Sequence, residues 1–359
     1  MRIKISSEVE FKIKSAIFIV ILLLSFVSFA KEKNKVEVVK NEKNKCVDIL
    51  VDGKLFTSYI YSDTIPVLKK TTLFPINAAC GVTITRGFPL QPRPGERIDH
   101  PHHIGAWFNY GDVNGLDFWN NSDAIPPEKA KDMGTIRHKK ILGIKSGKEK
   151  GELGVALNWL KPNGETIINE KTDFTFWAKD GIRIIDRATT LTAQKENVSF
   201  KDNKEGVVGL RVARELELPS TQPIILSDAH GNKTEVPVMD NTGVTGNYLS
   251  SEGITGADVW GKRARWVALS GTIKGNDVTI VIFDNPKNVG YPTYWHARDY
   301  GLFAANPLGQ SIFSEGKEVL NYKLDAGKSV TFKYRILILD GKANKDTIED
   351  EYKDFIGKK

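Results

Sequence analysis

The stretch VDILVDGKLFTSYIY, residues 47–61, predicts a β-hairpin. Its two halves, Val47–Val51 and Leu55–Tyr61, are rich in β-branched and aromatic residues, which favour strands. Between them lie Asp52 and Gly53, and an Asp-Gly pair readily adopts the positive φ angles of a tight hairpin turn. We therefore expect two antiparallel strands in this stretch.

Similar runs recur along the chain, each bounded by turn-forming residues such as Pro162-Asn163-Gly164. They are Gly81–Thr85, Val155–Leu160, Thr172–Ala178, Ile182–Leu191, Trp266–Thr272, Val278–Asp284 and Ser329–Leu339. Helical periodicity is scarce except near the C-terminus, where it predicts a short helix at about 345–357. Strands that follow one another without intervening helices favour an all-β fold, a large antiparallel β-sandwich.

The first 30 residues have the character of a secretory signal peptide. Basic residues precede the apolar run AIFIVILLLSFVSFA, residues 16–30, which is shorter than the roughly 20 residues of a membrane span. Small residues at its end predict cleavage near Ala30, and an uncleaved anchor is the alternative. We expect residues 31–359 to form one exported domain, periplasmic or extracellular, with its core at about 45–340. No integral membrane contact is expected after cleavage, because no second long apolar run follows.

The charge of the chain does not indicate a nucleic-acid partner. The formal net charge is +7, and removing residues 1–30, with four basic and two acidic residues, lowers it to +5. The remaining excess is scattered, and no basic stripe with interleaved aromatic residues is present. Two cysteines, Cys46 and Cys80, exclude a disulfide-rich scaffold, and they form either one disulfide or two free thiols.

Residues 97–119, RIDHPHHIGAWFNYGDVNGLDFW, carry three of the six histidines. In an extended conformation His100 and His102 share one face, and His103 points to the other. Two imidazoles on one face suit metal binding or the polarisation of a sugar oxygen, and Asp99 is placed to orient one of them. The alternative interpretation is a polar, hydrogen-bonded loop.

Residues 284–309, DNPKNVGYPTYWHARDYGLFAANPLG, crowd aromatic rings, His296 and charged groups together. Ring faces stack on the C–H faces of sugars, and Arg and Asp bond to hydroxyl groups. A buried aromatic cluster with a structural Arg–Asp pair is the alternative. From the two segments we predict these substrate-binding residues: Arg97, Asp99, Trp107, Trp119, Tyr294, Trp295, Arg298 and Asp299.

A third segment, FKDNKEGVVGLRVA at residues 200–213, places Glu205 at a loop-to-strand transition and Arg211 on the strand that follows. Such a carboxylate can act as a general base, and the guanidinium can stabilise negative charge. A surface glutamate is the alternative. The predicted catalytic residues are His100, His102, His103, Glu205, Arg211 and His296.

Three motifs together resemble a bacterial family known under the name PmoA, or methane oxygenase. They are DHPHHIGAWFNYGDVNGLDFW (99–119), KEGVVGLRVA (204–213), and FDNPKN with YPTYWHARDYGLFAANPLG (283–309), and the resemblance covers most of residues 45–340. It implies a β-supersandwich similar to galactose mutarotases, exported and involved in carbohydrate metabolism. Mutarotase-like sites use an Arg, two His and a carboxylate over a concave sheet. The matching residue types are Arg86 or Arg97, His100, His102 or His103, Glu205, Arg211 and His296.

The sequence thus predicts an exported carbohydrate-active enzyme of hydrolase, lyase or epimerase type, with His/Glu acid–base chemistry on a bound saccharide. Hydrolysis would require a second carboxylate, for which Asp99, Asp284 and Asp299 are candidates. One alternative is a non-catalytic carbohydrate-binding protein. Another is a metal-dependent enzyme. No cofactor is expected otherwise, and a divalent ion would be held by His100, His102 and His296.

Overall fold

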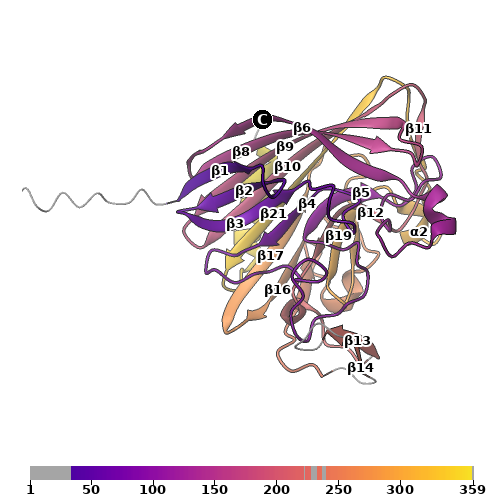
Figure 1. Ribbon diagram of the computed structural model, residues 1–359. Coiled ribbons are helices and arrows are strands. Elements are labelled where there is room, and N and C mark those ends of the chain that lie inside the picture. Colours follow the sequence, from indigo (N-terminus) through magenta and orange to yellow (C-terminus); the bar gives the residue numbers. More distant parts are fainter. Residues whose placement is uncertain (1–33, 222, 228–232, 237–239, 358–359) are drawn as a thin grey trace, which may run out of the picture. The chain divides into compact units, whose positions relative to one another are not determined.

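The computed structural model describes residues 34–221, 223–227, 233–236 and 240–357 (Figure 1). The predicted signal peptide, residues 1–30, lies outside these ranges. Within the described ranges no helix is long and apolar enough to cross a membrane.

Two large antiparallel sheets form the framework of the described chain. The strands of the first are β1 (Lys35–Asn41), β2 (Cys46–Val51), β3 (Lys54–Ile60), β4 (Thr72–Ile76), β5 (Ala106–Tyr110), β7 (Gly147–Lys148), β12 (Gly206–Arg211), β18 (Tyr294–Ala297) and β19 (Leu302–Asn306). Their order is β18-β19-β12-β5-β4-β3-β2-β1-β7. The strands of the second are β6 (Thr135–Lys145), β8 (Lys150–Leu160), β9 (Thr166–Lys179), β10 (Ile182–Ala193), β15 (Asn247–Ser250), β16 (Trp266–Ile273), β17 (Asn276–Asp284) and β21 (Ser329–Asp340). Their order is β15-β16-β17-β21-β10-β9-β8-β6.

Smaller elements accompany the two sheets. Two further antiparallel pairs are β11 (Val198–Phe200) with β20 (Tyr322–Leu324), and β13 (Ile224–Ser227) with β14 (Lys233–Val236). The short helices are η1 (Pro127–Asp132), η2 (Arg214–Leu216), η3 (Gly256–Val259), α2 (Gln310–Phe313) and α3 (Lys345–Gly357).

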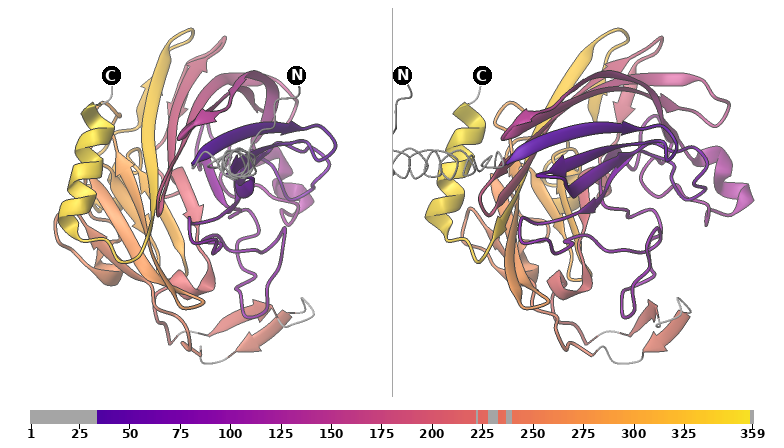
Figure 2. Two further views of the ribbon diagram at one scale, coloured as in Figure 1. Left: turned by 90° about the vertical axis from the view of Figure 1, so that its left-hand side faces the viewer. Right: turned by 60° about the vertical axis from the view of Figure 1, so that its left-hand side comes forward.

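The prediction of a large antiparallel β-sandwich with a short C-terminal helix is confirmed. Apolar side chains from both large sheets form one buried cluster, in which Ile49 of β2 and Phe174 of β9 take part. The opening hairpin is present as β2 and β3, and its turn residues Asp52 and Gly53 have φ angles of 52° and 79°. Figure 2 shows α3, in yellow, along the second sheet.

One expected strand is wrong. Residues Gly81–Thr85 form no ladder, and only isolated bridges involve Thr83 and Thr85. The bridge partners are Asn77 on one side and Val212 on the other, so no single neighbouring strand pairs with the run. The β-branched composition of the run was therefore not sufficient to make a strand without a continuous partner.

Strand alternation divides the nine-stranded sheet into a core face and an outer face. In β12, Val208 and Leu210 belong to the inter-sheet core, so Gly209 and Arg211 point to the opposite face. In β18, Trp295 belongs to the core, so the adjacent His296 points outward. This outer face, at β5, β12, β19 and β18, carries the candidate site.

Candidate functional site

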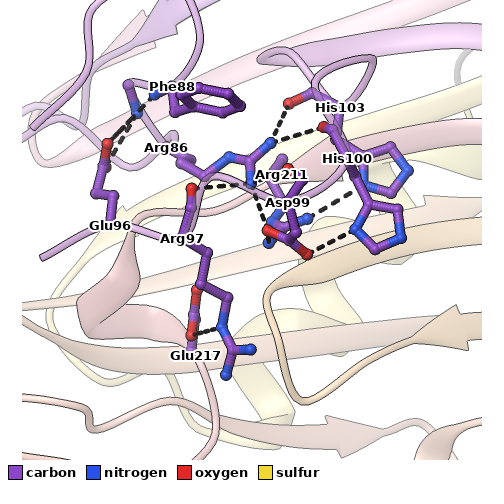
Figure 3. A network of polar contacts seen from close by, with 10 residues as sticks. Arg86, Phe88, Glu96, Arg97, Asp99, His100, His103, Arg211 and Glu217 are labelled. Atoms are coloured by element: carbon purple, nitrogen blue, oxygen red, sulfur yellow. Dashed lines mark hydrogen bonds and ion pairs between the residues drawn. The ribbon is translucent and has the colours of Figure 1, made fainter. Parts of the chain in front are cut away.

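The loop that holds the histidines is shaped by Arg86. Its guanidinium is buried and donates hydrogen bonds to the backbone carbonyls of Arg97, Asp99, His100 and His103 at 2.8 to 3.2 Å (Figure 3). His100 adopts a φ of 46°, a left-handed conformation that is uncommon for residues other than glycine. Arg86 therefore satisfies the carbonyls of a tightly curved loop and stabilises its unusual backbone.

Asp99 connects this loop to the sheet. One carboxylate oxygen, Oδ1, lies 2.8 Å from Arg86 Nη1 and 2.7 Å from Arg211 Nη2, and the other, Oδ2, lies 2.6 Å from His100 Nδ1. Burial works to raise the pKa of Asp99, but the charges of Arg211, Arg86 and His100 outweigh it and hold the pKa well below its usual range. Asp99 is thus a carboxylate that orients His100, as Figure 3 shows.

The His100 imidazole lies in a stack of rings. It is parallel to His103, with centroids 4.8 Å apart, and parallel to Tyr300 at 5.2 Å. His103 in turn stacks on Trp107 at 5.1 Å. The His100 side chain keeps 40% of its surface exposed, whereas His103 and Trp107 are buried. Of these stacked imidazoles, His100 is the one that a ligand can reach.

The other two loop histidines are buried and neutral. Burial, and then the charge of Lys70, lowers the pKa of His102 to about 2, and burial also lowers that of His103 well below its ordinary value. His103 lies 3.2 Å from both Arg211 Nη1 and Trp119 Nε1, two donors of which a neutral imidazole can accept only one. His102 Nε2 has no hydrogen-bond partner. These two rings are poorly placed to release protons to a substrate.

Glu205 and His296 meet on the same outer face. A Glu205 carboxylate oxygen lies 3.7 Å from His296 Nδ1, and that nitrogen also lies 3.0 Å from the Lys204 carbonyl. Burial raises the pKa of Glu205 and lowers that of His296 to about 3. The charge of His100 acts on both groups, lowering the pKa of each, so the glutamate and the loop histidine lie within electrostatic reach.

The structure therefore brings the predicted catalytic residues into one neighbourhood, although their motifs are far apart in the sequence. Direct contacts join Asp99, His100, His103 and Arg211, and a second contact joins Glu205 to His296. Of the histidines in this neighbourhood, His100 combines exposure with a carboxylate partner.

The predicted stacking rings are less accessible than the sequence suggested. Trp295 is fully buried in the inter-sheet core, and its indole nitrogen donates to the Ala264 carbonyl. Trp107 and Trp119 are buried against His103. None of these three indoles offers an exposed face to a sugar. The residue types were consistent with stacking, but burial by neighbouring elements decides whether a ring face is open.

The other predicted substrate-binding residues are also not arranged as the sequence suggested. They are Tyr294, Arg97, Arg298 and Asp299. Arg263 lies 4.4 Å above the Tyr294 ring, which is 6% exposed. Arg97 Nε donates to the buried Glu217 at 2.7 Å. No ion pair joins Arg298 to Asp299, so these adjacent residues do not form the structural pair that was the alternative interpretation.

Two residues of the site, Lys70 and Tyr300, were not among the predicted site residues. A third, Arg86, was predicted only as an alternative to Arg97. Lys70 is buried, donates to the His102 carbonyl at 2.7 Å and has a pKa lowered by burial to about 7. Tyr300 stacks on His100. The crowded aromatic segment signalled Tyr300, but no local pattern distinguishes Lys70 from other lysines.

A cavity of about 760 Å³ opens beside Asp99. Its walls are the loop around Arg97 and Ile98 and described residues of the β13–β14 hairpin, among them Lys233 and Glu235. Small-molecule sites commonly have volumes of about 300–1,000 Å³. The cavity is large enough for a saccharide unit, and Arg97 and Asp99 are the predicted substrate-binding residues that line it.

The residues proposed to hold a metal do not fit one well. Within the described ranges, no group of three or more His, Cys, Asp or Glu side chains is arranged around a common metal position. The three histidines named for a metal, His100, His102 and His296, are therefore not gathered around one position. The two cysteines, Cys46 and Cys80, are free thiols in this structure.

A family model described as "Family of unknown function (DUF6807)" matches residues 46–353. The chain belongs to this family. The matching model does not carry the PmoA name, so that part of the resemblance stays a prediction. No curated protein sequence matches the chain.

Solved structures with similar folds include carbohydrate enzymes. The GH36 α-galactosidase AgaB of Geobacillus stearothermophilus has a TM-score of 0.40 and 14% identity, over 85% of this chain and 41% of that chain. The chain therefore spans about two-fifths of the length of that enzyme. A galactose 1-epimerase of Lactobacillus acidophilus NCFM has a TM-score of 0.36 and 9% identity, over 87% and 100% of the two chains. Similarity at this level does not extend to function.

Proposed function

We propose that this chain is an exported carbohydrate-active enzyme that transfers protons to and from a bound saccharide with His100 and Glu205. The observation that carries the proposal is the exposed His100 imidazole, whose Nδ1 is fixed 2.6 Å from the Asp99 carboxylate within electrostatic reach of Glu205. An exposed imidazole with a carboxylate partner is the arrangement of a general acid or base.

The roles of the two groups follow from their environments. Hydrogen bonding of Nδ1–H to Asp99 leaves His100 Nε2 as the atom that gains or releases a proton, and the Asp99 charge stabilises the imidazolium that forms. Burial raises the pKa of Glu205, which makes this carboxylate a stronger base than an ordinary exposed glutamate. Arg211 holds Asp99 in place and contributes positive charge to the site.

These environments do not suit a hydrolysis in which Asp99 or Asp284 is the second carboxylate. Asp99 is engaged by two arginines and a histidine, and it is therefore an orienting group rather than a free nucleophile. Asp284 is buried at the end of β17 in the second sheet. Its carboxylate accepts hydrogen bonds from Asn288 Nδ2 and the Thr293 amide. Neither offers the second free carboxylate of a two-carboxylate glycosidase, so hydrolysis of that type would depend on Asp299, which is half-buried.

The test is a comparison of turnover and binding. Purified protein is screened against neutral and acidic mono- and oligosaccharides, and the best substrate is then used with Glu205→Gln and His100→Gln. We expect each variant to lose at least about 100-fold in kcat while its affinity changes little, because general acid–base groups contribute roughly 10²–10⁴-fold. Binding without turnover in the wild type would instead support the non-catalytic carbohydrate-binding alternative. Absence of both binding and turnover would contradict the proposal.

A further inference from the structure

Arg298 has no carboxylate partner within the part of the chain that the structure describes. Its guanidinium carbon lies 5.8 Å from the centroid of the Trp260 ring and 5.5 Å from that of Tyr300, and the residue is half-buried. Among the described residues no carboxylate lies within ion-pair distance of its guanidinium. Its hydrogen bonds are made by the backbone: the amide donates to the Leu302 carbonyl, and the carbonyl accepts from the Gly301 amide and the Tyr248 hydroxyl. By contrast, Arg263 and Arg335 combine a similar ring contact with a carboxylate partner.

This arginine belongs to the neighbourhood of the proposed site. Its charge lowers the pKa of His296, where it is the largest cause after burial, and it also acts on Tyr300. Tyr300 is in turn influenced by Glu205 and stacks on His100. Arg298 therefore lies beside the acid–base groups rather than at a remote position on the surface.

The carboxylates of this neighbourhood already face other cations. Asp99 shares its carboxylate between Arg86 and Arg211, and Glu205 lies 3.7 Å from Lys204 Nζ. Neither carboxylate makes an ion pair with Arg298. A guanidinium that is not neutralised attracts ligands of the opposite sign.

We propose that Arg298 binds the anionic group of an acidic saccharide, either a uronate carboxylate or a sulfate ester, and so selects acidic over neutral sugars. This inference rests on the proposed function, because it names the substrate class of the same site. The planar guanidinium presents its N–H donors in a fork that matches the oxygens of such anions. Contact with two ring faces holds the group in place without occupying those donors.

The test measures binding of matched ligands by calorimetry with the full purified protein. The probes are galactotriose, trigalacturonic acid and a sulfated galactotriose. We expect the wild type to bind at least one acidic probe roughly 10- to 100-fold more tightly than the neutral one, as for a hydrogen bond to a charged group. Arg298→Gln should remove this preference, and Arg298→Lys should retain part of it because the charge remains.

The control is Arg183→Gln, which removes one half-buried positive charge from β10 in the second sheet. It should leave the acidic preference unchanged, which separates a local contact from net charge. Thermal unfolding of every variant shows whether it is folded. Tight binding of the neutral probe, reduced equally by Arg298→Gln, would overturn this inference while the proposed function stands. If none of the saccharides binds, both fail. The arms with the two acidic probes distinguish carboxylate from sulfate.

Discussion

Replacing Asp99 with Asn tests whether the site depends on one shared carboxylate. Asp99 pairs with Arg86 and Arg211, whose side chains are 1% and 0% exposed, at 2.8 and 2.7 Å. Asn keeps the shape of the side chain but removes the charge, so two buried guanidinium groups lose their common counter-ion. Breaking a buried ion pair in this way costs about 3–5 kcal/mol.

The lower end of that range applies here. The Asp99 side chain is 33% exposed, so water screens part of the interaction, and Arg86 retains its backbone carbonyl acceptors. We therefore expect Asp99→Asn to lower the free energy of unfolding by about 3 kcal/mol at pH 7. The measurement is urea unfolding followed by tryptophan fluorescence and far-UV circular dichroism.

The pH dependence of this difference provides a second check. The pKa of Asp99 is depressed in the folded protein, so its contribution is fully present above the pKa of an unfolded aspartate, about 3.9, and is lost as the pH falls toward the folded value. The difference between wild type and Asp99→Asn should be constant from pH 5 to 8 and decrease below about pH 4.

Asp173→Asn is the matched control, because Asp173 makes an exposed pair with Lys171 and its side chain is 55% exposed. Removing such a surface pair should change the stability by less than about 1 kcal/mol. If Asp99→Asn is as stable as the control at pH 7, then the two arginines do not depend on the carboxylate and the reasoning fails.

Three further expectations concern the same neighbourhood. Arg86→Lys should speed limited proteolysis within residues 97–105 and lower the melting temperature, because a lysine cannot donate hydrogen bonds to all four loop carbonyls. Unchanged cleavage would show that other contacts hold the loop. His102→Gln should leave kcat within about tenfold of the wild type, because a buried histidine with a pKa of about 2 is not expected to transfer protons. A loss of kcat as large as that of His100→Gln would contradict this assignment of roles. Dialysis against a chelator should leave turnover unchanged and elemental analysis should find no stoichiometric metal, whereas recovery of activity only on adding a divalent ion would support the metal-dependent alternative.

The sequence alone determined the fold class. Alternating β-branched and aromatic runs, and the Asp52-Gly53 turn, are local signals, and local signals are sufficient to predict antiparallel strands. The C-terminal helix was equally local, because Ile348, Tyr352 and Phe355 repeat at helical spacing and are all buried in the structure. The exception, residues 81–85, shows that a strand also requires a partner, which the composition of a run does not reveal.

Only the tertiary structure decided which side of each strand carries the site. Period-two alternation places Trp295 and His296 on opposite faces, but packing of the second sheet determines that the tryptophan is the buried one. Arg86 and Arg298 provide a second example, because the sequence alone does not distinguish the roles of two arginines. Arg86 is enclosed by carbonyls and a carboxylate of the loop at residues 97–103, whereas Arg298 faces the rings of Trp260 and Tyr300 and has no counter-ion among the described residues. Packing of the folded chain decides these neighbours.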